Sequence, residues 1–327
     1  MRAQLSLILL LTVVGAVRST NDLNFLVMGD WGGSPSKPYT TRRERTTASG
    51  MNEVGGTINA RFALALGDNF YYNGVADVND PRFEETFESA FTGANLQGEN
   101  FFRVLLGNHD HYGNASAQIA YSDVSERWHI PGYFWDFEET YGKNDEFKLH
   151  VIMIDTVILA GGDEAKHSSL AGSKLPGPRD RRLFANYMIW IENKLKNSDA
   201  DHIIVAGHFP VWSICEHGPT NQLVSDLKPL LEQYNVSAYL AGHDHCAEVI
   251  VDSGVAYHGV GSANFNVISQ AHRFSIPHGS LKWHVGVRAI GGFASISMDG
   301  EDGGMKVVHH SGDGGTLYEA EKLMPKK

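Results

Sequence analysis

The chain alternates between short apolar runs and polar stretches, and five of the apolar runs end in the same way. Each stops at a glycine, and the residues that follow include carboxylates, amides, histidines and a tyrosine. Short apolar runs that end at glycine are typical of buried strands that turn into loops. Because strands that lie side by side bring their ends to one edge of a sheet, we expect these polar residues to converge. The five segments span residues 25–30, 62–71, 104–110, 203–208 and 239–245.

Helical patterns separate the predicted strands. Residues 40–59 are polar and helix-compatible, and Asp80 followed by Pro81 is typical of an N-cap and a first helical turn. Phenylalanines then recur every four residues and are expected to face the core, at Phe83, Phe87 and Phe91. Two more amphipathic helices are predicted, over Arg182–Lys196 with Leu183, Phe184, Tyr187, Ile191 and Leu195 on one side, and over Leu223–Tyr234 with Leu223, Leu227, Leu230 and Leu231.

After Val249 the pattern changes to short alternating segments broken by glycines, which predict antiparallel strands with tight turns. A further strand is predicted over Phe147–Ile154. Residues 160–178, rich in glycine, serine and charge, are expected to form a functional loop. These patterns and the strand-end placement of the polar residues predict an α/β fold in four layers, α/β/β/α, with two mixed sheets packed face to face and flanked by helices.

The first residues resemble a secretory leader. Arg2 gives a positive start, Leu5 to Val14 form an apolar core, and small residues within positions 15–19 suit cleavage. The alternative, a short buried strand or helix, fits this order less well. We expect a signal peptide over residues 1–19, a protein in the secretory pathway, and one domain over residues 20–327, because no linker or repeat divides the polar residues of the motifs.

Composition and charge narrow the function. The chain has 327 residues, is 42% hydrophobic and 20% charged, and carries a formal net charge of −11. Such a hydrophobic content is ordinary for a soluble protein with a core. The negative charge argues against a nucleic-acid partner, which requires basic surfaces. No internal apolar run approaches the length of a membrane span.

Two sequons and two cysteines fit a secreted chain. Asn114 and Asn235 each begin an Asn-x-Ser sequence and are predicted glycosylation sites. Cys215 and Cys246 both lie within two residues of a histidine of the motif set. They are either small buried hydrophobic residues or one disulfide at the rim of the site, and the sequence leaves both possibilities open.

The polar residues at the strand ends suit a pair of metal ions. A single Gly-Asp or Gly-His is usually an ordinary turn, but five such elements in matching contexts are not independent accidents. Two cations held closely together need an anionic bridge, and Asp68, in the middle of the set, is the natural candidate. His243 and His245, two residues apart, would share one face of an extended segment, so that Asp244 points away as a supporting or turn residue.

The order of these motifs resembles the calcineurin-like metallophosphoesterases. Tyr71, three residues after Asp68, resembles the purple acid phosphatases, and further stretches resemble the small tartrate-resistant group of animals over nearly the whole mature chain. These stretches are residues 29–33, 107–110, 114–121, 206–213, 216–220 and 291–294.

The resemblance implies a binuclear centre. Asp30, Tyr71 and His245 would hold Fe(III), and Asp68 would be shared with a second metal, Fe(II) or another divalent ion such as Zn or Mn. Three residues would complete the second site, namely Asn108, His208 and His243. A tyrosinate is a hard anionic donor that favours Fe(III) and gives a purple colour by charge transfer.

The resemblance also implies an acid phosphatase in which a metal-bound hydroxide attacks a phosphate monoester. His109 and His217 match positions beside the substrate, where an imidazolium can stabilise phosphoryl oxygens or protonate the leaving group. His109 could instead only orient Asn108 or a carboxylate. The alternatives are a metallophosphodiesterase or an iron-redox protein that generates reactive oxygen species. We expect a monomer, secreted or lysosomal, that acts on small-molecule or protein phosphomonoesters.

The chain departs from that group at one point. Mammalian members carry a disulfide that links the loop near Ala160 to the region of Gln222, and neither position is cysteine here. In the family this loop restrains activity until it is cleaved. Without the bridge we expect a looser loop, so control by cleavage does not follow from the resemblance.

Overall fold

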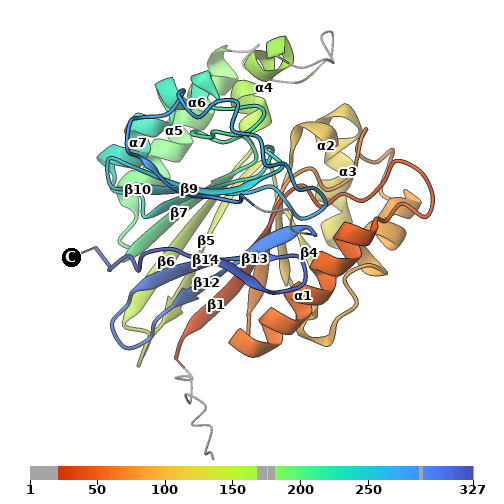
Figure 1. Ribbon diagram of the computed structural model, residues 1–327, viewed down its shortest axis with the longest axis horizontal. Helices are drawn as coiled ribbons and strands as arrows, with labels where there is room; N and C mark the ends of the chain where they lie inside the picture. Colours follow the sequence, from red (N-terminus) through yellow and green to blue (C-terminus); the bar gives the residue numbers. More distant parts are fainter. Residues whose placement is uncertain (1–20, 168–174, 176–180, 287–289, 327) are drawn as a thin grey trace, which may run out of the picture.

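Two mixed seven-stranded sheets pack face to face, with helices on their outer sides (Figure 1). The computed structural model describes residues 21–167, 175, 181–286 and 290–326. The predicted signal peptide therefore lies outside the described residues and stays a prediction. Among the described helices, none combines the length and the apolar character that crossing a membrane requires.

The first sheet is built around the N-terminal strand. Its order is β14 (Thr316–Glu319), β13 (Met305–Ser311), β12 (Gly292–Met298), β1 (Leu23–Met28), β2 (Phe62–Leu66), β3 (Phe102–Leu105) and β4 (Trp128–His129). β1 to β4 are parallel, whereas β12 to β14 are antiparallel, as the alternating pattern after Val249 predicts.

The second sheet has a parallel centre and antiparallel edges. Its order is β11 (Leu281–His284), β9 (Ala247–Asp252), β10 (Val255–Val260), β8 (Ala238–Ala241), β7 (His202–Gly207), β6 (Phe147–Ile154) and β5 (Phe134–Tyr141). The four central strands, β10, β8, β7 and β6, are parallel to one another, and β5, β9 and β11 each run antiparallel to the strands that they pair with.

The helices form the two outer layers. On one side lie α4 (Thr156–His167), α5 (Arg181–Asn197), α6 (Asn221–Asp226) and α7 (Lys228–Gln233), which group over the second sheet (Figure 1). The other side carries α1 (Arg42–Ile58), η1 (Phe83–Glu88), η2 (Ala94–Leu96), α2 (Asn108–Tyr112), α3 (Ala115–Ala120) and η3 (Tyr121–Asp123).

Three separate hydrophobic clusters fill the spaces between the four layers. In β1, Phe25 and Val27 belong to the cluster between the sheets, whereas Leu26 and Met28 belong to the cluster under α1. A third cluster joins α5 to the second sheet. Because successive strand residues point to opposite faces, strands buried on both faces read as continuous apolar runs.

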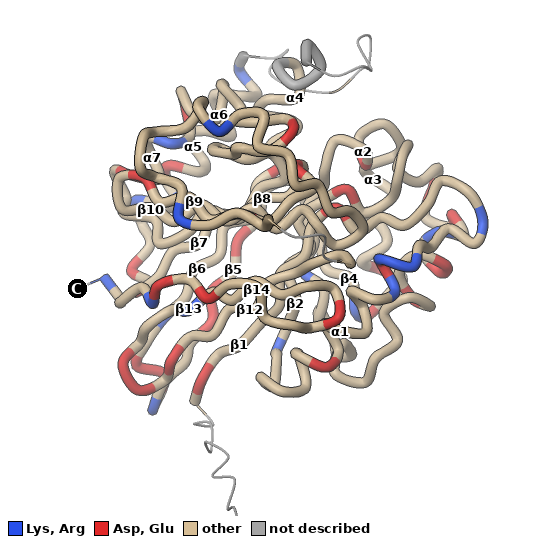
Figure 2. Tube along the Cα trace, viewed as in Figure 1, with Lys and Arg blue, Asp and Glu red and all other residues tan. Residues whose placement is uncertain are grey.

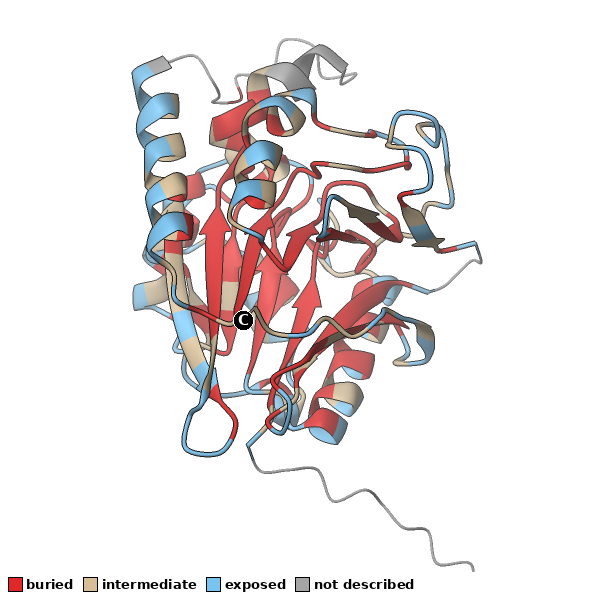
Figure 3. Cartoon of the chain, turned by 90° about the vertical axis from the view of Figure 1, so that its left-hand side faces the viewer, coloured by how far each residue is buried: buried red, intermediate tan, exposed pale blue. Residues whose placement is uncertain are grey.

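Figure 3 shows the buried strands and the exposed outer faces of the helices. In Figure 2 the charged residues lie mainly in outer loops and helices. The predicted four-layer α/β fold is confirmed.

Two predicted helices differ in detail. The segment predicted as one helix over Leu223–Tyr234 is two short helices that meet at Leu227. Pro229 explains the break, because proline has no N–H for the hydrogen bond to Ser225 and its ring crowds that carbonyl group. In α5, Ile191 and Leu195 are buried as expected, but Leu183 is 44% exposed and the prediction for it was wrong.

The helix predicted to open at Pro81 is present: residues 81–82 are helical and continue into the short π-helix η1, and Phe83, Phe87 and Phe91 are buried as predicted. The proposed loop over 160–178 was also partly wrong. Its first residues continue α4 as far as His167, and residues 168–174 and 176–180 lie outside the described residues.

Two buried histidines connect the sheets and predict acid sensitivity. His258 Nδ1 in β10 lies 3.1 Å from His309 Nε2 in β13. Burial lowers the pKa of His258 from 6.5 to about 4, and burial together with His258 and His310 lowers that of His309 well below 6.5. Between pH 6.5 and about 4, a histidine in the unfolded chain takes up a proton that the buried histidine in the folded protein does not. Stability therefore falls as the pH drops through this range.

We expect His258→Gln to remove its share of this pH dependence. The drop in unfolding free energy between neutral pH and pH near 4, measured by urea unfolding, should be smaller than in the wild type by roughly 1–3 kcal/mol. The exposed His278 serves as the control, since His278→Gln should leave the pH dependence unchanged. An identical pH dependence in His258→Gln and wild type would contradict the prediction.

Candidate metal centre

The predicted ligands follow the carboxyl ends of five parallel strands, three in the first sheet and two in the second. In open α/β sheets this edge is where ligands usually bind. Both sheets contribute because they pack with these ends on the same side. Asp30 follows β1, Asp68 and Tyr71 follow β2, Asn108 follows β3, His208 follows β7, and His243 and His245 follow β8.

One group of side chains gathers around Asp30. The Tyr71 hydroxyl lies 3.0 Å from Asp30 Oδ1 and 3.2 Å from His245 Nε2, and His245 Nε2 is 3.4 Å from Asp30 Oδ1. One donor atom each from Asp30, Asp68 and His245 lie within 4.8 Å of one another. The set offers carboxylate, phenol and imidazole donors in one place.

A second group shares Asp68 with the first. His208 Nε2 lies 3.3 Å from Asp68 Oδ1 and 3.0 Å from Asn108 Oδ1. The ring of His243 lies 5.2 Å from that of His208, centre to centre. The structure thus brings all seven predicted residues together, with Asp68 between the two groups. Their role as metal ligands stays a prediction.

The backbone at the centre is strained. Asp30, Asp68 and His243 have φ angles of 57°, 51° and 67°, in the left-handed region that residues with a side chain seldom adopt. Such a conformation costs about 1–2 kcal/mol per residue. The surrounding contacts hold it, since the N–H of His243 donates to Asp30 Oδ2 at 2.8 Å and that of Asp30 to the Gly67 carbonyl at 3.1 Å. The segment of His243 and His245 is therefore a turn, not the extended segment that the sequence predicted.

The glycines of the motifs leave room for the donor atoms. A Cβ atom on Gly107 would lie 2.2 Å from Asp68 Oδ1, and one on Gly242 would lie 2.5 Å from Asp30 Oδ2. Any side chain at these two positions would therefore displace a carboxylate of the centre.

Electrostatics show that the site suits positive charge. Burial alone would raise the pKa of Asp68, but His208 and His109 lower it well below its ordinary value. Burial opposes a charged His208, yet Asp68 raises the pKa of His208 to about 10. The environment of His208 thus favours a positive charge, and a metal ion bound there would displace the proton.

The same conclusion follows from Tyr71. Burial, Asp30 and Asp68 raise the pKa of its phenol well above 10, because a third negative charge would be unfavourable among these oxygens. A cation among them would reverse that effect. Iron and divalent ions such as zinc and manganese are commonly bound by oxygen donors together with imidazole. The seven predicted ligands therefore fit a pair of such metal ions.

Both predicted substrate-side histidines border the centre. His217 is exposed, and its ring stacks on that of His243 at 4.3 Å between centres. His109 Nδ1 lies 2.6 Å from the Tyr72 carbonyl oxygen, and its Nε2 lies 4.0 Å from Asp68 Oδ2. His109 also donates its backbone N–H to Asp68 Oδ1 at 2.9 Å, so it orients this carboxylate, and its contact with a substrate stays a prediction.

The sequence missed two residues that shape the centre. Asp110 is buried and accepts from the N–H groups of Gly107 at 2.8 Å and Asn69 at 3.0 Å, which fixes the turns after β2 and β3. It ends the third motif, so a signal existed. Phe265 stacks on His245 with ring centres 4.0 Å apart, but no pattern around it indicated that contact.

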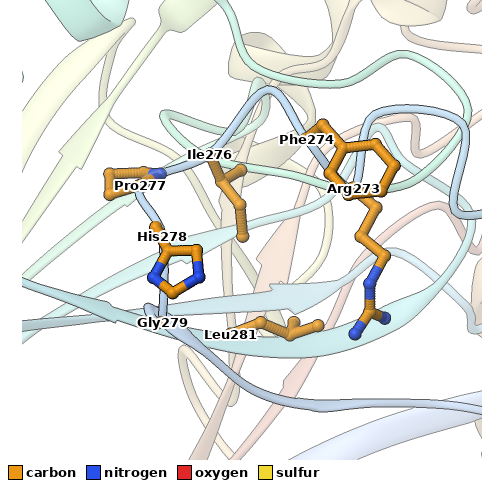
Figure 4. A pocket seen from close by; sticks show the side chains of 7 residues that line it. All are labelled: Arg273, Phe274, Ile276, Pro277, His278, Gly279 and Leu281. Atoms are coloured by element: carbon orange, nitrogen blue, oxygen red, sulfur yellow. The ribbon is translucent and has the colours of Figure 1, made fainter.

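The segment that follows Phe265 forms a surface pocket. Its volume is about 460 Å³, and it is lined by Arg273, Phe274, Ile276, Pro277, His278, Gly279 and Leu281 (Figure 4). The N–H of His272 donates to the Ile214 carbonyl at 3.0 Å, which joins this segment to the one that carries His217. None of the predicted ligands lines the pocket.

The cysteines and the sequons have clear positions. Cys215 and Cys246 form a disulfide, which decides between the two possibilities that the sequence left open. Asn114 and Asn235 are both exposed, and their glycosylation stays a prediction.

Known proteins resemble this chain in sequence over nearly its whole length. Residues 23–247 match the family model of the calcineurin-like phosphoesterases. The chain is 40% identical to tartrate-resistant acid phosphatase type 5 of Oryctolagus cuniculus over 94% of this chain and 93% of that protein. It is 40% identical to the Homo sapiens protein of the same name over 92% and 91%. Purple acid phosphatase 17 of Arabidopsis thaliana is 31% identical over 72% and 66%.

Solved structures share the fold. GAP50, described as the anchor in the inner membrane complex of Plasmodium, matches with a TM-score of 0.77 at 23% identity, over 94% of this chain and 90% of that chain. Purple acid phosphatase PPD1 from yellow lupin (Lupinus luteus) matches with a TM-score of 0.63 at 13% identity, over 94% and 54%. At these identities the likeness shows the fold alone.

We expect the disulfide to stabilise the folded chain. Replacing both Cys215 and Cys246 with alanine removes a cross-link between residues 31 positions apart. By the loop-entropy relation this should lower the unfolding free energy by about 3–4 kcal/mol. Urea unfolding at neutral pH measures the loss, and the wild type unfolded in reductant is the matched control. Equal stability of the wild type with and without reductant would contradict the prediction.

Proposed function

The chain belongs to the calcineurin-like phosphoesterase family and, within it, to the purple acid phosphatases, so it is a phosphoesterase; we propose that it hydrolyses phosphate monoesters in acid at a binuclear metal centre. The observation that carries this proposal is the meeting of two donor groups that share Asp68, with His217 exposed beside them. A lone metal site would not need a shared carboxylate, and a storage site would not need an exposed histidine at its rim.

The donor chemistry assigns a role to each group. The group with Tyr71 would hold Fe(III), because a phenolate is a hard anionic donor, and the group with Asn108 would hold a divalent ion such as Fe(II), Zn or Mn. Asp68 would bridge the two. When bound, such a pair lowers the pKa of a water molecule so that it can act as a nucleophile, and it neutralises charge on the phosphate.

The chain's own residues control the proton and the substrate. His109 Nδ1 is held by the Tyr72 carbonyl oxygen, and the other ring nitrogen, Nε2, lies toward the centre, where it can bind phosphoryl oxygens. His217, as an imidazolium, donates a proton to the leaving oxygen while the bond between phosphorus and that oxygen breaks and the bond to the attacking oxygen forms. The products are an alcohol and orthophosphate. Histidine protonation favours this step in acid.

The same proposal covers the setting of the enzyme. Substrates are small-molecule or protein phosphomonoesters, and the protein is a secreted or lysosomal glycoprotein that acts as a monomer. The Cys215–Cys246 disulfide supports this location, since disulfides persist in oxidising compartments.

Tyr71→Phe tests the iron assignment. The variant loses the phenolic oxygen but keeps an aromatic ring against Phe265 and His109. We expect the charge-transfer band in the visible spectrum of the metal-loaded protein to disappear. Tyr72→Phe is the matched control, since Tyr72 is the adjacent tyrosine and is 48% exposed; it should keep the band. A band that survives in Tyr71→Phe would refute the assignment.

His217→Ala tests the chemistry. Loss of a general acid should lower kcat by about 10²–10⁴-fold for alkyl phosphates, whose leaving groups need a proton. Activated aryl phosphates should lose much less. Metal content and the visible band should stay unchanged, and Asp68→Ala should instead lose both metals and turnover.

Two comparisons complete the test. His278→Ala, in the exposed segment of the pocket, should leave both substrate classes unaffected. The proposal is falsified if His217→Ala slows alkyl and activated aryl phosphates equally. The oxygen chemistry of an iron-redox protein would need no leaving-group acid. A preference for phosphodiesters over monoesters in the wild type would favour the diesterase alternative.

A further inference from the structure

The segment that carries His217 has no regular secondary structure, although its position decides where the ring lies. His217 and the preceding Glu216 are both exposed. The His217 ring nevertheless stacks on that of His243 at 4.3 Å. An exposed histidine on an irregular segment has several rotamers available in solution, so its position depends on how the backbone beneath it is fixed.

The backbone under His217 is held by Asp244. Asp244 Oδ1 accepts from the N–H of His217 at 2.7 Å, and Oδ2 accepts from the N–H of Gly218 at 3.1 Å. The Ser213 hydroxyl donates to the same Oδ2 at 2.5 Å. Asp244 is 2% exposed, so these bonds lie away from water, where a carboxylate that accepts several of them binds its donors firmly.

The start of the same segment is fixed by further contacts. Ser213 Oγ accepts from the N–H of Cys215 at 3.0 Å, and the buried carboxyl group of Glu248 accepts from the N–H of Ile214 at 3.1 Å. The disulfide from Cys215 to Cys246 attaches the segment covalently to the chain just after His245. These contacts leave the end of the segment, at His217, dependent on Asp244.

The other side of the segment is closed as well. Gly218 has a φ angle of 76°, and a Cβ atom there would lie 2.4 Å from the ring of His272. The backbone at residues 217 and 218 therefore lies between the Asp244 carboxylate and His272, so it cannot move away from either without a rearrangement.

We propose that Asp244 is a positioning residue for the reaction, which holds the backbone of His217 so that its imidazole meets the leaving group of the substrate. The inference rests on the proposed function, because it assumes that His217 is the general acid. Asp244 touches no reacting atom and acts only through His217, in contrast to its neighbours His243 and His245, which face the donor groups.

Asp244→Asn weakens the hold on the His217 backbone with little change in the size and shape of the side chain. Asparagine accepts at one oxygen and presents an NH₂ group to the remaining donors, so the three bonds cannot all form. We expect kcat for an alkyl phosphate to fall by about 10–100-fold and kcat for an activated aryl phosphate by less than about threefold. KM, metal content and the visible band should stay close to the wild type.

A double-mutant cycle separates positioning from general damage. If Asp244 acts through His217, adding Asp244→Asn to His217→Ala should cost nothing further with the alkyl phosphate. Asp252→Asn is the matched control. Its carboxylate accepts from Trp212 Nε1 at 3.2 Å and so anchors the chain just before the segment, and its variant should leave the ratio of the two substrates unchanged.

Ser213→Ala provides a second route to the same result. It removes one donor to Asp244 four residues from His217, together with the acceptor of the Cys215 N–H. We expect a smaller loss, about 3–10-fold, with the same preference for the activated aryl phosphate. If Asp244→Asn does not fold, this variant carries the test alone, and an equal loss for both substrates would overturn the inference.

The remaining outcomes distinguish this inference from the proposed function. Loss of metal by folded Asp244→Asn would overturn the inference, since the carboxylate would then serve the metal centre. Additive effects in the double variant would also overturn it. If His217→Ala itself shows no dependence on the leaving group, the proposed function fails first. If His217→Ala shows that dependence and Asp244→Asn does not, only the positioning role is refuted.

Discussion

The crowding of buried anionic oxygens at one edge of the two sheets is the constraint on which the rest of the structure depends. Asp30, Asp68 and the Tyr71 hydroxyl lie within reach of the same few atoms, and all are buried. This arrangement is unfavourable in isolation, as the raised pKa of Tyr71 shows. It requires cations or protonated histidines nearby, glycines where a Cβ would intrude, and a backbone that is forced into the left-handed region at three positions. The repulsion between these buried oxygens therefore explains why histidines and glycines lie together at the strand ends.

The sequence predicted most of the fold and of the ligand positions because both follow from local patterns. A strand buried on both faces is largely apolar, so β1, β2 and β7 were visible as apolar runs, and the glycine at the end of each run marked where the strand stops. The same logic failed where the decisive contact is distant. Leu183 fits a helical stripe but is exposed at the start of α5, and one proline divides a stripe that is periodic from Leu223 onward.

Contacts between loops were the least predictable. Nothing in the spacing of Phe265 indicates that it stacks on His245, and nothing around Asp244 indicates that it accepts from a backbone segment 27 residues earlier. The cysteine pairing was likewise open, because a spacing of 31 residues fits both a bridge and two isolated buried residues. Such contacts are set by the packing of irregular segments against one another, which no periodicity records.

The division of the seven donors between two sheets has a consequence for the order of assembly. Four of them follow strands of the first sheet, namely Asp30, Asp68, Tyr71 and Asn108, and the other three follow strands of the second, namely His208, His243 and His245. Neither sheet alone presents either donor group in full, because Asp30 needs His245 and Asn108 needs His208. A partly folded chain in which only one sheet has formed would therefore lack a complete donor group for either proposed ion. If bound, these ions would link the two sheets, whereas the disulfide joins Cys215 to Cys246 between strands of the second sheet alone.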